Sequence, residues 1–289
     1  MEQIVVGFDG SKPAMGALRW AAEEAERHGW EVLVVQSWRE PILGDRPLIE
    51  IWQDPEAGAR LVKAELDGAV DRVAGDHPAV HFSTQLLGDR PDRVIIEVSE
   101  DAPLVVVGAR GRGGFSSLLL GSVSRRVASG AASTVVVVRG KWDAGGDVVV
   151  GVDGSVPSRR ALAWAAAEAR QRRCRLRVVL AWSYLLPEGV HGPEPFRASY
   201  TDADARLTLR TIADEVLGTD PGVEVELEAT CELAAKALME RGEDAALLVV
   251  GPRKSSMRTR FDLGSVTLQL LHHAPCPLAI VRSGEDQET

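Results

Sequence analysis

Three glycines are spaced in a way that suits the binding of a phosphate group. Gly108 and Gly111 stand three positions apart, and Gly121-Ser122 follows after nine intervening residues. A backbone without Cβ atoms can lie directly against a ligand, and glycine readily adopts the positive φ that reversing loops often need. We therefore interpret Gly108 as a point of close approach to a ligand and Gly111 as the residue that turns the loop.

Two expected elements would position these glycines. Leu104–Val107 is a short apolar run, typical of a buried parallel strand, and Ser122–Ala131 is predicted to be a helix. The first amides of a helix have no partner within it and lie at the positive end of its dipole. A phosphate would satisfy them, so the strand, the loop and the helix start together predict a nucleotide site.

Other phosphate motifs do not occur in the sequence. It has no Gly-x-x-x-x-Gly-Lys-Ser/Thr, and Gly111-Arg112-Gly113 lacks the third glycine of a dinucleotide fingerprint. The run Arg110–Gly114 looks like an arginine–glycine RNA-binding segment. A single such run in an acidic chain is more typical of a loop, Arg112–Leu120, whose arginines face phosphate or solvent.

Composition limits the class of protein. The chain has 289 residues, 45% of them hydrophobic and 26% charged, which predicts a soluble protein of two domains. Its formal net charge of -9 argues against nucleic acid as a partner. Three scattered cysteines favour a reducing compartment, and neither a leader pattern nor an apolar run of about 20 residues occurs, so we expect no membrane and a cytoplasmic location.

The sequence contains an internal repeat. Ile4–Ser11 recurs as Val148–Ser155 at an offset of 144 residues, and Gly108 and Gly121-Ser122 recur as Gly251 and Gly264-Ser265 at an offset of 143. The glycine-rich stretch 140–146 reads as a tight linker. We therefore predict two similar domains, residues 1–140 and 147–283, followed by a frayed acidic tail.

Strands and helices alternate within each copy. In the first copy the expected order is a strand at 4–8, a helix at 13–27, a strand at 31–37, a long connection at 39–55, a helix at 54–71, a strand at 81–86, a helix at 92–100, a strand at 104–107, a helix at 122–131 and a strand at 134–138. Uniformly apolar strands predict an α/β fold with a parallel sheet covered by helices on both faces. If the first and fourth strands are neighbours, Asp9 and Gly108 face each other across a ligand crevice.

Simpler interpretations exist for most of these residues. Asp9 and Asp153 suit ordinary Asp-Gly turns, and Gly121-Ser122 suits an ordinary helix start; their recurrence and spacing favour binding. Trp20 and Trp164 are most simply core residues. His272-His273 with Cys276 has no counterpart in the first copy and no fourth ligand, so we expect no metal site.

Val-Gly-Phe-Asp-Gly-Ser before a helix, and Gly-x-x-Gly-nine-Gly-Ser, resemble the universal stress proteins, and the duplication resembles their tandem form. The resemblance implies a five-stranded parallel sheet in each half, Rossmann-like and similar to the adenine nucleotide α-hydrolases, with ATP, with or without Mg²⁺, at its carboxyl edge. In the first copy it implies an adenosine end at Gly7, Phe8, Asp9 and Ser37, and a ribose and phosphate end at Val107, Gly108, Gly111, Gly121, Ser122, Val123 and Ser124. In the second copy it implies Gly151, Val152, Asp153, Ala181, Val250, Gly251, Lys254, Gly264, Ser265, Val266 and Thr267.

Lys254 departs from this pattern because it stands where the first copy has Gly111. If that residue must be left-handed, a side chain costs roughly 1–2 kcal/mol. A lysine would alternatively meet the phosphates directly through its ammonium group. We predict that the first site binds the nucleotide and that the second binds it more weakly or in an altered geometry.

No nucleophile with an evident base is found, so the sequence names no catalytic residue. The resemblance implies an ATP-binding regulator of stress adaptation, survival or growth arrest, with at most slow ATP hydrolysis. Alternatives are an adenylating or ATP-hydrolysing enzyme of the α-hydrolase type, a flavin or dinucleotide carrier, and a structural pairing module. The resemblance also implies pairing of the two domains through their last strands; a homodimer and an unknown protein partner are further expectations.

Overall fold

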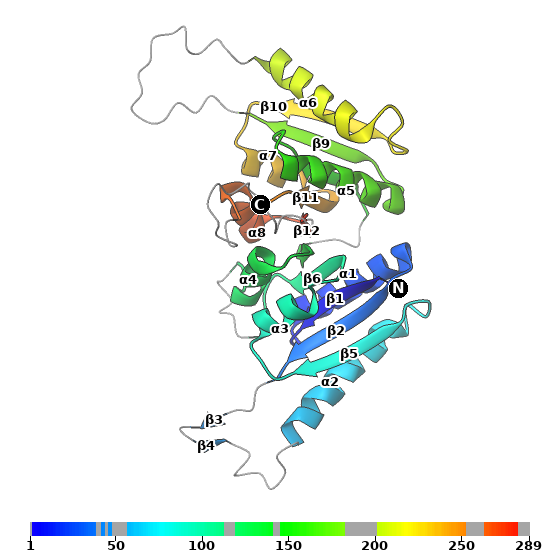
Figure 1. The fold of residues 1–289 in the computed structure, drawn as a ribbon, viewed down its shortest axis with the longest axis vertical. Coiled ribbons are helices and arrows are strands. Elements are labelled where there is room, and N and C mark those ends of the chain that lie inside the picture. Colours follow the sequence, from blue (N-terminus) through cyan, green and yellow to red (C-terminus); the bar gives the residue numbers. More distant parts are fainter. Residues whose placement is uncertain are drawn as a thin grey trace. The chain divides into compact units, whose positions relative to one another are not determined.

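The computed structural model describes residues 2–38, 57–112, 119–140, 145–182, 201–252 and 263–282, together with the backbone of 42–43 and 46–47. Lys254, the middle of the loop Arg112–Leu120, most of the connection 39–55, most of the linker and the acidic tail lie outside these residues. The chain forms two compact units that divide between Val138 and Arg139 (Figure 1). No described helix is both long and apolar enough to cross a membrane.

The first unit is a five-stranded parallel sheet with the strand order β5-β2-β1-β6-β7. Its elements are β1 (Gln3–Phe8), α1 (Lys12–His28), β2 (Glu31–Ser37), α2 (Ala57–Ala74), β5 (Phe82–Leu87), α3 (Pro91–Val98), β6 (Leu104–Gly108), α4 (Ser122–Gly130) and β7 (Thr134–Val138). A short antiparallel pair, β3 (Ile42–Leu43) and β4 (Arg46–Pro47), lies in the connection after β2.

The second unit repeats this topology with the strand order β10-β9-β8-β11-β12, all parallel. Its elements are β8 (Asp147–Gly151), α5 (Val156–Arg172), β9 (Leu176–Ala181), α6 (Asp202–Leu217), β10 (Val225–Thr230), α7 (Ala234–Arg241), β11 (Ala245–Val250), α8 (Ser265–His273) and β12 (Leu278–Ile280). The α/β architecture with parallel sheets, expected from the alternation of apolar strands and amphipathic helices, is confirmed.

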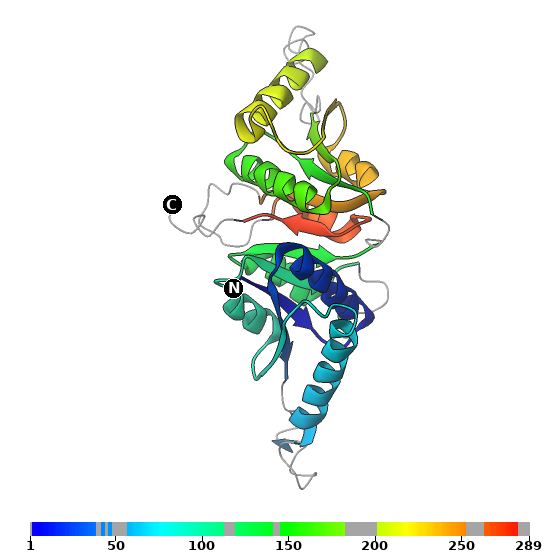
Figure 2. The ribbon, with the colours of Figure 1, turned by 90° about the vertical axis from the view of Figure 1, so that its right-hand side faces the viewer.

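The helices of each unit cover both faces of its sheet. In the first unit α1 and α2 pack together on one face, and α3 and α4 pack together on the other (Figure 2). The crossovers change face between β1 and β6, which are hydrogen-bonded neighbours. The adjacency that brings Asp9 and Gly108 to one crevice is therefore confirmed.

Local sequence explains where the first helices begin. The hydroxyl of Ser11 accepts a hydrogen bond from the amide of Ala14, and the hydroxyl of Ser155 accepts one from the amide of Ser158. A proline occupies the first turn of both helices, where its missing N–H costs nothing. Helix α1 ends at Gly29, which takes a left-handed φ of 69°.

Most element ends agree with the sequence to within a few residues. The end of α3 and the burial of one tryptophan differ from what we expected. Helix α3 stops at Val98, because the hydroxyl of Ser99 turns back to the carbonyl of Ile96. Trp20 is fully buried as predicted, whereas Trp164 is only partly buried, so the expectation that both are core residues was wrong for the second.

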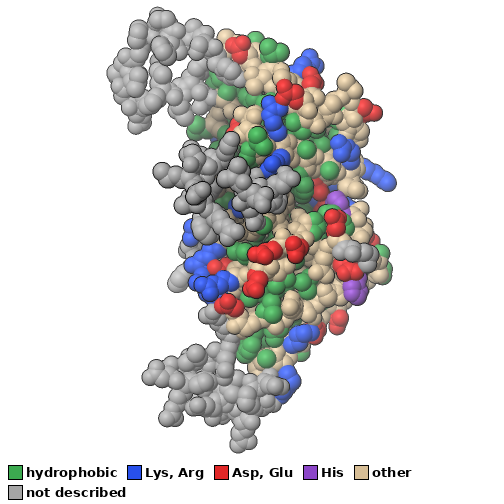
Figure 3. Space-filling model, viewed as in Figure 1, with side chains coloured by type: hydrophobic (Ala, Val, Ile, Leu, Met, Phe, Trp, Pro, Cys, Tyr) green, Lys and Arg blue, Asp and Glu red, His purple; other side chains and the backbone are tan. Residues whose placement is uncertain are grey.

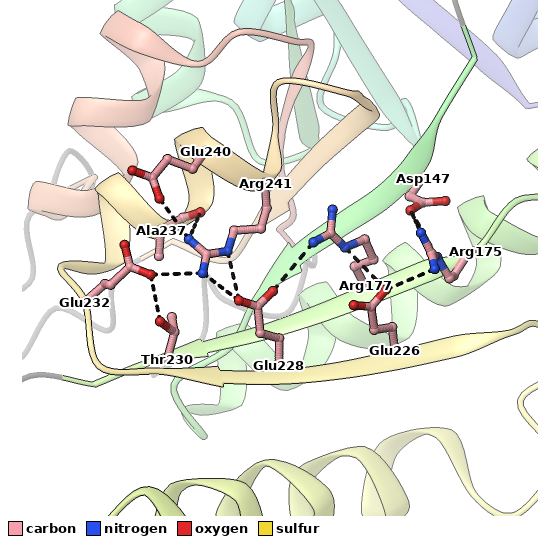
Figure 4. A network of polar contacts seen from close by, with 10 residues as sticks. All are labelled: Asp147, Arg175, Arg177, Glu226, Glu228, Thr230, Glu232, Ala237, Glu240 and Arg241. Carbon is pink, nitrogen blue, oxygen red and sulfur yellow. Dashed lines mark hydrogen bonds and ion pairs between the residues drawn. The ribbon is translucent and has the colours of Figure 1, made fainter.

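The two sheets differ on the face covered by α3 and α7. In the first unit Leu33, Leu87 and Val98 extend an apolar cluster around Val5 and Val35. In the second unit the matching positions hold Arg177, Thr230 and Arg241, which belong to a chain of ion pairs and hydrogen bonds along β9, β10 and α7 (Figure 4). One fold therefore covers this face in two chemically different ways.

Candidate functional site

The carboxyl ends of β1 and β6 are joined through the side chain of Asp9. One carboxylate oxygen of Asp9, Oδ1, accepts the amide of Ser11 at 3.0 Å, and the other, Oδ2, accepts the amide of Arg112 at 2.8 Å. The same carboxylate thus fixes the turn before α1 and the loop after β6. It lies at the switch point of the sheet, where open α/β sheets bind their ligands.

Gly108 has a packing requirement of its own. A Cβ atom at Gly108 would lie 2.6 Å from the carbonyl carbon and 2.7 Å from the carbonyl oxygen of Pro13. At Gly251 a Cβ would lie 2.6 Å from the carbonyl oxygen of Pro157. In both units the glycine allows the end of the fourth strand, β6 or β11, to lie directly beside the start of the first helix. The approach of Gly108 to a ligand stays a prediction.

Gly111 does not adopt the positive φ that we expected of it. Its φ lies outside the left-handed region, and a Cβ there would come within 2.3 Å of Asp9 Oδ2. Glycine at this position leaves room for the carboxylate of Asp9 beside the loop, and no left-handed backbone demands it. The cost assigned to Lys254 depended on a left-handed φ, which Gly111 does not adopt.

Two helices at the carboxyl edges begin without a side-chain cap. Helix α4 starts after Gly121 and helix α8 after Gly264, and no side-chain hydrogen bond caps either start. The amide of Gly121 itself donates to the carbonyl of Ala109 at 2.8 Å. The predicted phosphate-binding residues Ser122, Val123 and Ser124, and their counterparts Ser265, Val266 and Thr267, form the first turns of these helices. Their amides are therefore the groups that a bound anion would reach first.

The hydroxyl of Ser124 has a structural partner. It is buried and donates to the carbonyl of Gly108 at 2.7 Å, so it links α4 to the end of β6. Ser37 is similar, because its hydroxyl donates to the carbonyl of Asp89. Phe8 and Val107 are buried in the core. At Phe8 and Val107 only the main chain is available to a ligand.

A cavity of about 470 Å³ lies at the carboxyl edge of the second unit. Every described residue predicted for the second site lines it, namely Gly151, Val152, Asp153, Ala181, Val250, Gly251, Gly264, Ser265, Val266 and Thr267. Sequence reasoning missed further lining residues, including Ser158, Val179 and Leu238, which face the cavity from α5, β9 and α7. Their helical and strand patterns look like those of ordinary core residues, so the sequence carried no signal for them.

Asp153 is the only ionisable side chain among the described residues that line this cavity. Partial burial acts to raise its pKa, but hydrogen bonds from Ser155 and Ser158 outweigh that effect and hold the pKa below its usual range. The carboxylate is therefore ionised at neutral pH. It can accept hydrogen bonds from hydroxyl groups of a ligand, while the amides of α8 can donate to an anionic group.

Two arginines of the first unit, one before α3 and one within α4, share a carboxylate. Asp92 is buried and pairs with Arg90 at 3.0 Å and with Arg126 at 3.5 Å. Figure 3 shows Lys and Arg side chains grouped over α3 and α4 on the side of the molecule in view. The corresponding positions in the second unit are Leu233 and Gln269. The first unit therefore has two arginines paired with Asp92 where the second unit has uncharged residues.

Comparison with known proteins identifies the family. The model of the universal stress protein family matches residues 1–139 and again residues 146–282. Universal stress protein Rv2005c of Mycobacterium tuberculosis is 30% identical over 292 residues, covering 96% of each chain. A universal stress protein structure from Archaeoglobus fulgidus DSM 4304 covers 97% of this chain and 98% of its own at a TM-score of 0.68 and 19% identity. A structure of the universal stress protein from Archaeoglobus fulgidus in complex with dAMP covers 47% of this chain and 94% of its own, with 27% identity and a TM-score of 0.35. The chain belongs to the universal stress protein family and carries two copies of the family domain in tandem.

Proposed function

We propose that the protein binds ATP at the carboxyl edge of each sheet and acts as a nucleotide-dependent regulator in stress adaptation. The observation that carries this proposal is an uncapped helix start that opens beside a strand-end carboxylate at the switch point of each sheet. The cavity at the second site falls within the volume range typical of small-molecule sites.

Three groups of residues would contact the nucleotide. The first-turn amides of α4 and α8 would donate to phosphate oxygens at the positive ends of the helix dipoles. Asp9 and Asp153 would accept hydrogen bonds from the ribose hydroxyls. The main chain at Ser37 and Ala181 would border the adenine. Mg²⁺ would arrive as the counter-ion of the phosphates.

Retention of nucleotide, rather than rapid turnover, suits the second site best. Asp153 is the only ionisable group among its described lining residues, and its lowered pKa makes it a weak general base. An adenylating enzyme would also need an acceptor group beside the phosphates. Slow hydrolysis, a cytoplasmic location, a homodimer and a protein partner stay predictions.

Mass spectrometry of small molecules released from the purified, denatured chain tests the proposal. We expect adenine nucleotide in the released fraction and ATP binding by calorimetry after its removal. The variant Gly121→Leu places a side chain over the amides of α4, and should lose the first site while remaining folded. Gly16→Leu is a matched control, because a Cβ at Gly16 in α1 meets no atom within 4 Å. A native chain that neither releases nor binds any adenine nucleotide would refute the proposal.

A further inference from the structure

Arg112 connects three elements beside the first site. Its amide donates to Asp9 Oδ2 at 2.8 Å, which fixes the start of the side chain at the crevice. Its guanidinium lies over Gly10, where a Cβ atom would come within 2.1 Å of Nη2. The same Nη2 pairs with Glu65 of α2. The guanidinium is therefore held across the turn that precedes α1 by a carboxylate from a neighbouring helix.

In the second unit a helix glutamate pairs with an arginine from another helix. Glu215 of α6 pairs with Arg159 of α5, and Arg159 Nε also donates to the carbonyl of Gly154 at 3.1 Å. Arg159 occupies the position of Met15 in the first unit, so this arginine comes from a helix and not from the loop after the fourth strand. It is absent from the residues that line the second cavity. In each unit a helix glutamate thus pairs with an arginine near the glycine turn, and in the first unit that arginine, Arg112, comes from the loop after β6.

We propose that Glu65 is an internal counter-ion that occupies Arg112 until a nucleotide polyphosphate displaces it, so that Arg112 selects ligands by their number of phosphates at the first site. This inference rests on the proposed nucleotide function. Arg112 would position the phosphates and discriminate between ligands by their number, and Glu65 would lower the affinity of the first site for nucleotide.

The exposure of the pair makes such an exchange feasible. The side chains of Arg112 and Glu65 are 52% and 46% exposed, and ion pairs this exposed contribute little to stability. A triphosphate carries several negative charges and can accept both N–H groups of the guanidinium fork. The carboxylate can therefore be replaced without breaking the fold, and a ligand with fewer phosphates gains less from the replacement.

The test compares single and double variants of the full chain by calorimetry with ATP, ADP and AMP. Removing the competing charge in Glu65→Gln should tighten ATP binding by about two- to fivefold, the range that an exposed ion pair allows. The gain should shrink from ATP to AMP. Arg112→Gln should weaken ATP binding, and Glu65→Gln added to Arg112→Gln should bring no further gain. Glu215→Gln is the matched control and should leave the first site unchanged.

The outcomes separate this inference from the proposed function. If the native chain binds ATP but Glu65→Gln binds it equally or more weakly, the counter-ion role is wrong and the proposed function stands. A gain that is equal for ATP and AMP, or that survives in the Arg112→Gln background, also overturns it. A native chain that takes up no ATP overturns both. Thermal unfolding of each variant confirms that the exposed substitutions leave the fold intact.

Discussion

Substituting Gly108 by alanine separates a packing requirement from a binding requirement. The added Cβ would lie 2.6 Å from the carbonyl carbon of Pro13 and 2.9 Å from the amide nitrogen of Ala14. Both atoms belong to the backbone at the start of α1, so no side-chain rotation can relieve the clash. Strand β6 and helix α1 must move apart, which loosens the contact that closes the crevice.

The size of the effect follows from the nature of the contact. Overpacking a well-packed interior costs about 1–3 kcal/mol, and a backbone neighbour favours the upper part of that range. The reduced entropy of the unfolded chain offsets roughly 0.4–1 kcal/mol of it. At about 2–4 °C per kcal/mol for a protein of this size, the first unit should unfold several degrees earlier.

Differential scanning calorimetry measures this shift, and two further variants calibrate it. Gly251→Ala should destabilise the second unit by a similar amount, because its Cβ would meet Pro157 at 2.6 Å. Gly121→Ala should cost less, since its nearest contacts would be 3.5 Å and its φ of -76° suits alanine. If Gly108→Ala unfolds at the native temperature yet loses nucleotide, Gly108 is a ligand-approach residue and our packing argument fails.

Two further predictions concern titratable groups of the second unit. Burial raises the pKa of Cys276 to about 12, so a maleimide at pH 8 should modify the exposed Cys231 and leave Cys276 unmodified until the chain unfolds; native-state labelling of Cys276 in peptide maps would contradict this. Hydrogen bonds from Thr230 and Arg241 lower the pKa of Glu232 from 4.5 to about 2. Its contribution to stability is therefore complete above the unfolded pKa of 4.5 and is lost as the pH falls towards 2. Urea midpoints should fall more steeply between pH 5 and pH 3 for the native chain than for Glu232→Gln, and equal slopes would refute the assignment.

The sequence predicted the architecture because the architecture depends on local patterns. Apolar runs such as Leu104–Val107 can be buried only inside a sheet covered on both faces. The constant offset between the repeated motifs indicates two copies of one domain. The switch point then follows from topology, which is why Asp9 and Gly108 were expected at one crevice. Each of these inferences uses residues near one another in the chain or a general rule of parallel sheets.

The roles of individual residues depended on distances that the sequence does not contain. The sequence singled out Gly108 and Gly111, but it could not show that they pack against Pro13 and Asp9, about 100 positions away in the chain. The pairing of Glu65 with Arg112 likewise joins α2 to a loop that follows β6. An ordinary exposed helix glutamate gives no sign of such a partner, so only the fold reveals it.

The fold alone does not explain why residue 121 is a glycine. Its φ and ψ of -76° and 151° suit any residue, and a Cβ there would make ordinary contacts of 3.5 Å. A serine or aspartate at this position would cap α4 and stabilise it, because a side-chain oxygen would accept a first-turn amide. Glycine gives up that cap and leaves the space in front of the amides open. At Gly264 the positive φ of 66° already favours glycine, so its identity says nothing about a ligand. Gly121 has no such backbone reason and is therefore the more informative of the two. A ligand that occupies this space and accepts those amides accounts for the choice of residue, and this supports placing the phosphates there.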